Sequence, residues 1–179
     1  MQSIPVQLSG AEPLCRGSRP PDLTRVRDLL KLIKDPEIPV LTIGDLGILR
    51  EVKLTGDRVV VTITPTYSGC PAMRGIEQDI RSVMTGAGYS VEIRTALSPA
   101  WTTDWLSDAG RVKLKAYGIA PPRKGTADKR SLMAEDSQIV CPRCDSDNTR
   151  KLSEFGSTAC KALHTCNECL QPFDYFKCL

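Results

Sequence analysis

Two pairs of cysteines near the carboxyl end of the sequence have the spacing of a metal site. They are Cys141-Pro-Arg-Cys144 and Cys166-Asn-Glu-Cys169, with 21 residues between the pairs. A CxxC turn brings two thiolates to one ion, and a hairpin can place a second pair opposite, which supplies the four sulfur ligands of structural zinc. The segment 139–179 is too short to bury a sufficient core, so a metal would supply part of its folding free energy. The spacing therefore predicts a structural zinc site, with a redox-active CxxC and an iron–sulfur cluster as alternatives.

The same segment contains three further side chains that could bind a metal: Cys160, His164 and Cys178. Because four ligands close a tetrahedral site, we expect all three to lie outside it, with His164 as a hydrogen-bonded surface residue. Cys160 lies in a loop of small residues. Cys160 and Cys178 are candidates for a second metal site or for contact with a partner.

A cysteine at the predicted start of a helix is the other candidate for chemistry. The stretch Thr64-Pro-Thr-Tyr-Ser-Gly-Cys-Pro71 runs from a strand into a helix. Pro71 suits the first helical position, which puts Cys70 at or beside the N-cap. Unpaired amides and the helix dipole are expected to lower the pKa of the Cys70 thiol there. Cys70 is either an exposed thiol that reacts with metal or sulfur, or a small buried residue that fills a tight turn.

Two acidic segments could place carboxylates beside that thiol. They are Asp35-Pro-Glu37-Ile-Pro39 and Gly44-Asp45-Leu-Gly47. Acidic side chains next to Pro and Gly more often cap turns, and the residues alone favour this interpretation.

Hydrophobic periodicity predicts the elements that position these residues. Helices are expected at 23–33, 71–86 and 104–117, and strands at 46–54, 59–64 and 89–94. The order helix-strand-strand-helix-strand-helix indicates an α+β protein, a small α/β sandwich followed by a three-stranded zinc ribbon. The chain then divides into a disordered arm (1–21), the sandwich (22–119), a linker (120–138) and the ribbon (139–179).

Composition excludes several classes of function. The chain has 24 Lys and Arg against 21 Asp and Glu, a net charge of +3, and in 139–179 the charges cancel at five of each sign. A nucleic-acid partner is therefore not expected. We read no secretory signal and no apolar run long enough to cross a membrane, so a cytoplasmic location with reduced cysteines is expected. Exposed strand edges in the sandwich would permit a homodimer.

The quoted motifs resemble known families. Asp35-Pro-Glu-Ile-Pro39, Asp45-Leu-Gly-Ile48 and the stretch ending in Cys70-Pro71 resemble a domain of cytosolic iron–sulfur assembly factors. The ribbon carries Phe155-Gly-Ser-Thr-Ala-Cys-Lys-Ala162 and Pro172-Phe-Asp-Tyr-Phe-Lys-Cys178. Together with the first domain it resembles the D subunits of the bacterial phenylacetyl-CoA epoxidase (ring 1,2-epoxidase) system.

The resemblance implies an accessory or maturation factor in aerobic phenylacetate catabolism, rather than a stand-alone enzyme. Its partners would be other subunits of this multicomponent monooxygenase, an iron–sulfur flavin reductase or a di-iron oxygenase. It also implies that Cys70, Asp35 and Glu37 handle transient iron or an iron–sulfur cluster. The alternative is a structural subunit of the oxygenase complex with no role in metal transfer.

Overall fold

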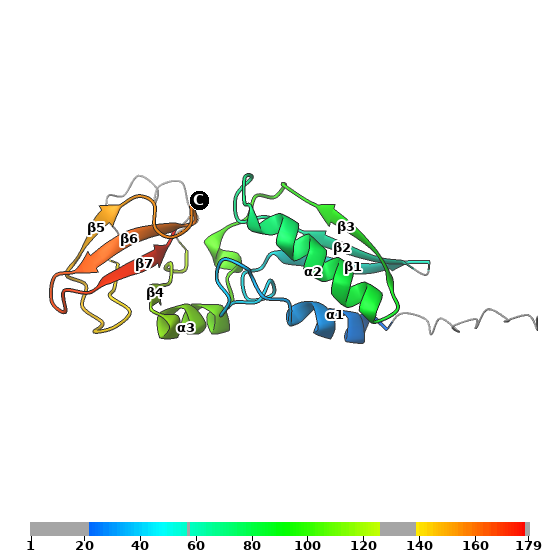
Figure 1. Cartoon of the computed structure of the whole chain (residues 1–179), viewed down its shortest axis with the longest axis horizontal. Helices are drawn as coiled ribbons and strands as arrows, with labels where there is room; N and C mark the ends of the chain where they lie inside the picture. The colour runs from blue at the N-terminus through cyan, green and yellow to red at the C-terminus, as the bar shows by residue number, and fades with distance from the viewer. Residues whose placement is uncertain (1–21, 57, 126–138, 178–179) are drawn as a thin grey trace, which may run out of the picture.

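The computed structural model describes residues 22–56, 58–125 and 139–177 (Figure 1). The predicted arm 1–21, most of the predicted linker and Cys178 lie outside these residues. The helices are α1 (Leu23–Lys31), α2 (Ala72–Gly86) and α3 (Asp108–Tyr117), with a 3₁₀ helix η1 (Thr103–Trp105). The strands are β1 (Leu49–Thr55), β2 (Arg58–Ile63), β3 (Ser90–Thr95), β4 (Ile119–Ala120), β5 (Thr149–Ser153), β6 (Lys161–Cys166) and β7 (Pro172–Phe176). The predicted fold class, an α/β sandwich followed by a zinc ribbon, is confirmed.

The sandwich is a three-stranded sheet with α1 and α2 packed on one face. β1 and β2 form an antiparallel hairpin, and β3 lies parallel to β2 after the α2 crossover (Figure 1). A parallel pair needs such a crossover, because a tight turn can join only antiparallel neighbours. Alternate residues of β2 point toward the helices and are fully buried: Val59, Val61 and Ile63. They meet the buried positions of α1 and α2: Val26, Leu30, Ile76, Ile80 and Met84.

The opposite face of this sheet is charged. Glu92 of β3 forms ion pairs with Arg94 at 2.7 Å and with Arg58 at 3.4 Å. Glu51 and Lys53 pair at 2.8 Å on β1. Exposed pairs of this kind add little stability. The charged side chains on this face are exposed to solvent. The sandwich therefore has two layers, the sheet and the pair of helices α1 and α2.

The connection between α1 and β1 is buried although it contains no long element. Six of its apolar side chains are at most 5% exposed: Ile33, Ile38, Leu41, Ile43, Leu46 and Ile48. Backbone hydrogen bonds hold it in place, among them Asp35 N to Leu41 O at 2.9 Å and Ile43 N to Ile33 O at 2.9 Å. This segment carries the acidic motifs, so their carboxylates are set by a rigid connection.

The ribbon is a sheet in the order β4-β7-β6-β5. The three expected strands β5, β6 and β7 are antiparallel neighbours. A fourth strand was not predicted from the sequence: β4 directly follows α3 and pairs in parallel with β7, with Ile119 opposite Asp174. The polypeptide therefore enters the ribbon sheet as soon as it leaves α3.

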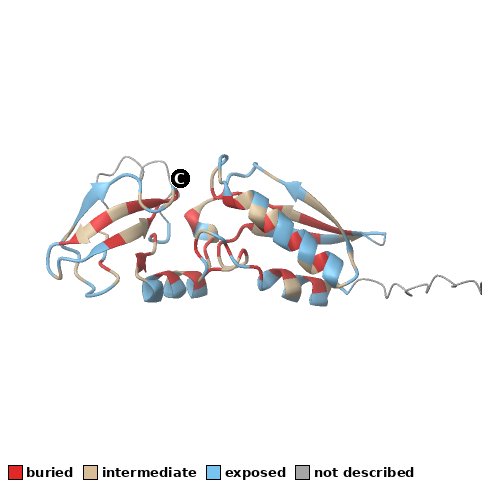
Figure 2. Ribbon diagram, in the orientation of Figure 1, coloured by how far each residue is buried: buried red, intermediate tan, exposed pale blue. Residues whose placement is uncertain are grey.

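The ribbon packs against the sandwich through the start of β6 and the end of β7. Phe176 is 1% exposed, and its ring meets that of Trp101 edge to face at a centroid distance of 6.0 Å. The Trp101 indole in turn donates to Leu46 O at 2.8 Å. Phe176 and Cys160 belong to the same buried cluster as the sandwich core. Buried positions accordingly run from the sandwich into β6 and β7 (Figure 2).

Gly47 is required by the contact between the α1–β1 connection and η1. It has φ +69°, and a Cβ there would lie 2.6 Å from Trp105 O. Gly56 has φ +62°, and no atom lies within 4 Å of its virtual Cβ. We expect Gly56→Ala to lower the free energy of unfolding by about 1 kcal/mol through backbone strain. Gly47→Ala should cost about 2 kcal/mol more, because overpacking is added to the strain.

Urea denaturation of the two variants measures this difference. Equal destabilisation of Gly47→Ala and Gly56→Ala would contradict the proposed close packing at Trp105.

Candidate metal sites

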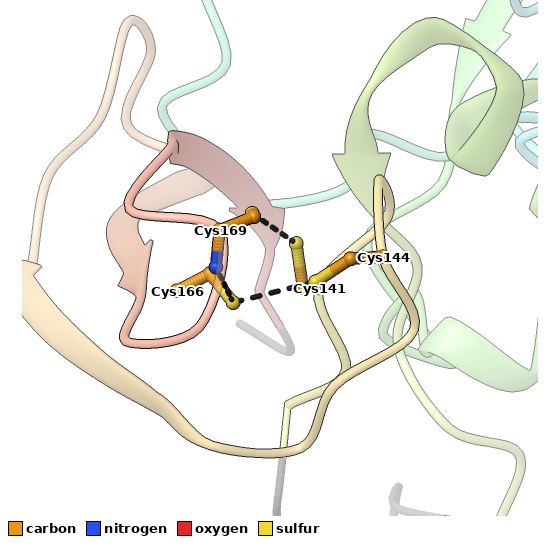
Figure 3. A group of neighbouring side chains, drawn as sticks. All are labelled: Cys141, Cys144, Cys166 and Cys169. Carbon is orange, nitrogen blue, oxygen red and sulfur yellow. Dashed lines mark hydrogen bonds between the residues drawn. The ribbon is translucent and has the colours of Figure 1, made fainter.

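The two CxxC pairs come together as predicted. Cys141 and Cys144 lie in the turn before β5, while Cys166 and Cys169 flank the turn after β6 (Figure 3). Their four Sγ atoms all lie within 4.8 Å of one another. The Sγ of Cys141 is 3.7 Å from that of Cys169, and the Sγ of Cys144 is 3.5 Å from that of Cys166.

These distances fit a tetrahedral metal ion. With zinc–sulfur bonds of about 2.3 Å, tetrahedral ligands lie about 3.8 Å apart. Two of the thiols, those of Cys141 and Cys166, are fully buried, and the Cys169 amide faces the Cys166 sulfur at 3.5 Å. All six described cysteines are free thiols, so none of the four is committed to a disulfide. The set is closed, with four sulfur ligands and no place for a substrate.

The pKa values of these thiols indicate a competition for protons within the cluster. The Cys169 backbone amide lowers the pKa of Cys166 to about 7. The Ser146 amide acts in the same direction on Cys144, but the side chains of the other three cysteines, together with burial, outweigh it and raise the pKa of Cys144 to about 12. A divalent ion that displaces the protons removes this conflict.

The other candidate ligands of the ribbon lie away from the four cysteines. Cys160 immediately precedes β6 and Cys166 ends it, so about 20 Å of extended chain separates them. His164 is 3% exposed, stacked on Phe173 and edge-on to Tyr175, with ring centroids 5.9 and 5.6 Å away. The expectation of a surface histidine is therefore wrong: His164 fills the ribbon interior as an aromatic residue does. Cys178 lies outside the described residues.

Cys70 lies in the turn before α2, half-buried. The helix begins at Ala72 with Pro71 at its N-cap, one residue later than expected. The expectation of a lowered thiol pKa is wrong, because burial raises the pKa of Cys70. The Ala72 amide opposes this effect, but the negative charges of Glu37 and Asp35 add to it.

The two carboxylates of the first acidic motif have different surroundings. Asp35 is 5% exposed, and its Oδ1 accepts from the amides of Glu37 at 2.8 Å and Ile38 at 2.7 Å. This closes a turn, although burial outweighs these bonds and raises the pKa of Asp35. Glu37 instead extends to the ribbon, where the Cys160 thiol faces its Oε2 at 3.8 Å. Of the two, Glu37 has the carboxylate that is free to bind a cation.

Asp45 belongs to the scaffold rather than to a metal site. Its Oδ2 accepts from Lys113 Nζ at 2.6 Å and from the Thr42 amide at 3.0 Å. Its backbone oxygen accepts from the amide of Ser107, the residue that caps α3. Asp45 thus ties the α1–β1 connection to the helix that leads into the ribbon.

Comparisons with known proteins match the two halves of the chain separately and then together. Residues 23–95 match a family described as iron–sulfur cluster assembly protein, and residues 125–177 match the PaaD zinc beta ribbon domain. A protein of Escherichia coli (strain K12), named as the D subunit of 1,2-phenylacetyl-CoA epoxidase, is 50% identical over 161 residues. The match covers 89% of this chain and 95% of the relative. The chain belongs to the PaaD family.

Three other relatives match about half of this PaaD-family chain. An Fe-S protein maturation auxiliary factor of Porphyromonas gingivalis (strain ATCC BAA-308 / W83) is 36% identical over 89 residues, 48% of this chain and 84% of the relative. Among solved structures, a domain of unknown function from Bacillus anthracis has a TM-score of 0.48 and 24% identity. It covers 51% of this chain and 89% of its own. A conserved hypothetical protein from Thermotoga maritima has a TM-score of 0.45 and 25% identity, with coverage of 52% and 93%.

The PaaD ribbon cluster should lose its metal when one thiolate is removed. We expect Cys144→Ser to reduce bound zinc from about one ion per chain to a small fraction of that, because the serine hydroxyl is a poor ligand. Elemental analysis of purified protein measures the change. Cys70→Ser is the matched control, since it removes a thiol outside the cluster. Full zinc content in Cys144→Ser would show that the cluster is not the binding site.

The contacts of Asp45 predict that the free energy of unfolding of this PaaD-family protein depends on pH. Burial acts to raise the pKa of Asp45, but the Lys113 ammonium and the Thr42 donors outweigh it and hold the pKa below its ordinary value of 3.8. A carboxyl group with a lowered folded-state pKa stabilises the protein above the unfolded value, and this contribution is lost as the pH falls through the folded one. At pH 7 we expect Asp45→Asn to lower the free energy of unfolding by about 1–2 kcal/mol.

Denaturation at a series of pH values checks this. The gap between wild type and Asp45→Asn should narrow as the pH falls below 3.8. The exposed Asp79→Asn is the control and should stay within about 0.5 kcal/mol of wild type. A gap that is constant with pH would mean that the Asp45 charge is not involved.

Proposed function

We propose that this protein is an accessory factor of a phenylacetyl-CoA epoxidase system, and that it assists the assembly of an iron or iron–sulfur centre in a partner subunit. The observation that carries the proposal is the position of Cys70. It is half-buried beside Glu37 and Asp35, within the part of the chain that matches iron–sulfur cluster assembly proteins. That part is joined in one chain to the ribbon of an epoxidase subunit family.

The chemistry of Cys70 suits cargo that is held for a time and then passed on. Thiolate sulfur is a strong ligand for iron, and a nearby carboxylate favours a cation. A thiol that keeps its proton in the absence of metal exchanges that proton for the cation on binding and takes it back on release. Cys70 is the cargo ligand and Glu37 assists it. Asp35 shapes the turn that presents Glu37.

The ribbon has a structural part in this function. Its four cysteines hold zinc, and the ion stabilises a surface for protein contact. Large apolar side chains of the ribbon are exposed, among them Leu152 at 46%, Phe155 at 66% and Leu170 at 75%. With equal numbers of acidic and basic residues in 139–179, contact with a protein subunit is favoured over contact with nucleic acid.

The partner is the subunit that contains iron, either the iron–sulfur flavin reductase or the di-iron oxygenase. No helix in the described part of the chain is long and apolar enough to span a membrane. The free thiols of the described residues fit a reducing cytoplasm. The substrate of the epoxidase, a coenzyme A thioester, fits the same compartment. A homodimer stays a prediction.

The function is tested by producing the epoxidase subunits together with wild-type protein, with Cys70→Ser, or without this protein. We expect Cys70→Ser to give partner subunits with the low iron content found without the protein, and phenylacetyl-CoA epoxidation should fall in proportion. Iron per purified subunit is the primary measurement. Ser68→Ala, a change in the same turn, should leave the iron content at the wild-type level.

Full iron loading with Cys70→Ser would remove the thiol from the mechanism. If complexes then dissociate without this protein while their iron content stays normal, the structural-subunit alternative holds. Size-exclusion chromatography of the reconstituted complex measures that outcome.

A further inference from the structure

The ribbon contributes a second thiol to the surroundings of Cys70. The Sγ of Cys160 lies 3.8 Å from Oε2 of Glu37, although 123 positions separate the two residues in sequence. Cys160 is 4% exposed, and its sulfur lies 3.0 Å from Thr158 Oγ1. A nucleophilic sulfur of the ribbon is therefore buried against the carboxylate of the sandwich.

Cys70 faces the same region from the sandwich side. It packs against the buried cluster that contains Cys160. After burial, the negative charges of Glu37 and Cys70 add to the raised pKa of Cys160. The raised pKa of Tyr67, which lies in the same turn as Cys70, likewise results from burial and then from the charges of Cys70, Glu37 and Cys160. In Figure 1 the start of β6 and the end of β7 point toward the sandwich at the end where α2 begins. Two thiols and a carboxylate thus converge from two parts of the chain.

The charges of this region favour a cation. Asp35, Glu37 and the two thiols all gain negative charge on deprotonation. Two buried basic groups near Cys160 are paired with other carboxylates: Lys161 with Asp174 at 3.5 Å and Lys177 with Glu154 at 3.7 Å. Two sulfur ligands and one carboxylate oxygen suit a transition metal ion such as ferrous iron better than magnesium or calcium, which prefer oxygen ligands alone.

The set is more open than the ribbon cluster. Among the described residues, only the four ribbon cysteines have ligand atoms that all lie within 4.8 Å of one another. A change of one χ1 rotamer moves a cysteine sulfur by about 3 Å, so the proposed binding relies on rotation of the cysteine side chains. Three ligands leave a coordination position open, as expected for an ion that must be transferred.

We propose that Cys70 of the sandwich and Cys160 of the ribbon bind one ferrous ion together, with the Glu37 carboxylate as third ligand. The proposal rests on the proposed function and assigns its cargo site to the junction of the two parts. The ribbon then has two tasks at its two ends: zinc binding at the CxxC turns, and completion of the cargo site before β6.

Cobalt(II) titration of the zinc-loaded, full-length protein tests the shared site, with cobalt as a spectroscopic substitute for ferrous iron. Wild type should show thiolate-to-cobalt charge-transfer absorption while its ribbon zinc is retained. Cys70→Ser and Cys160→Ser should each remove about half of this absorption and weaken cobalt binding by about tenfold or more. Glu37→Gln should weaken binding but leave the absorption per bound cobalt unchanged, since it removes no sulfur. Ser68→Ala and the exposed Glu51→Gln should match wild type.

The zinc content of each variant verifies that its ribbon is folded. If a serine variant does not fold, Glu37→Gln still tests the site, because it removes the third ligand and keeps both thiols. Cobalt affinity within about twofold of wild type, with unchanged absorption per bound cobalt, in Cys160→Ser would overturn the shared site. So would an absence of any cobalt absorption in the wild type. The proposed function is tested separately by the iron content of the partner subunit. If Cys70→Ser lowers that iron content and Cys160→Ser does not, the proposed function holds with Cys70 as its only cysteine ligand, and the shared site is wrong.

Discussion

The ribbon cannot form a core of its own, and this constraint explains how the rest of the molecule is arranged. Its separate buried cluster consists of only four residues, two of them ligand cysteines: Ala120, Cys141, Cys166 and Phe173. Burial on that scale gives little free energy against the entropy of ordering about forty residues. The sheet therefore needs support at both ends. A metal cluster holds the CxxC turns, and the sandwich core receives Phe176 and Cys160 at the other end.

Support from the sandwich also fixes the position of the ribbon. The parallel pairing of β4 with β7 joins the ribbon sheet to the end of α3. The Asp45 hydrogen bonds secure the start of α3, and the contact between Trp101 and Phe176 closes the junction. The interactions that hold Cys160 beside Glu37 are thus backbone pairing and aromatic packing, which are stronger constraints than the exposed ion pair between Lys115 and Asp145.

The sequence was informative wherever the determinants are local. Hydrophobic periodicity predicted the two sandwich helices and the strands of their sheet, because a helix and a strand repeat with different periods. The CxxC spacing predicted the four-cysteine cluster for a similar reason. In contrast, β4 has two residues and no pattern, and it exists only because β7 lies next to it. The burial of His164 likewise depends on cross-strand neighbours that its own segment does not specify.

The Cys70 environment was misjudged for the same physical reason. Its position before a helix is a local property and correctly placed it near the first amides of α2. Its pKa depends on burial and on Glu37 and Asp35, which the chain brings there from the connection before β1. No pattern within the Cys70 segment could reveal that these charges oppose the helix effect. Cys160 and Glu37 are 123 positions apart in sequence, so only the folded structure could show that they lie close together.

The two groups of thiols differ in a way that separates storage of a structural ion from transfer of cargo. In the ribbon, four sulfurs already stand at tetrahedral spacing, and removing the ion would leave their protons in conflict and the sheet without support. At the junction, burial and the charge of Glu37 raise the pKa of both thiols, which favours their protonated form in the absence of a cation. An ion there must displace protons and gains fewer ligands, which weakens its binding relative to the ribbon. Under the proposed function, that difference would let one small protein keep one metal ion and release another to its partner.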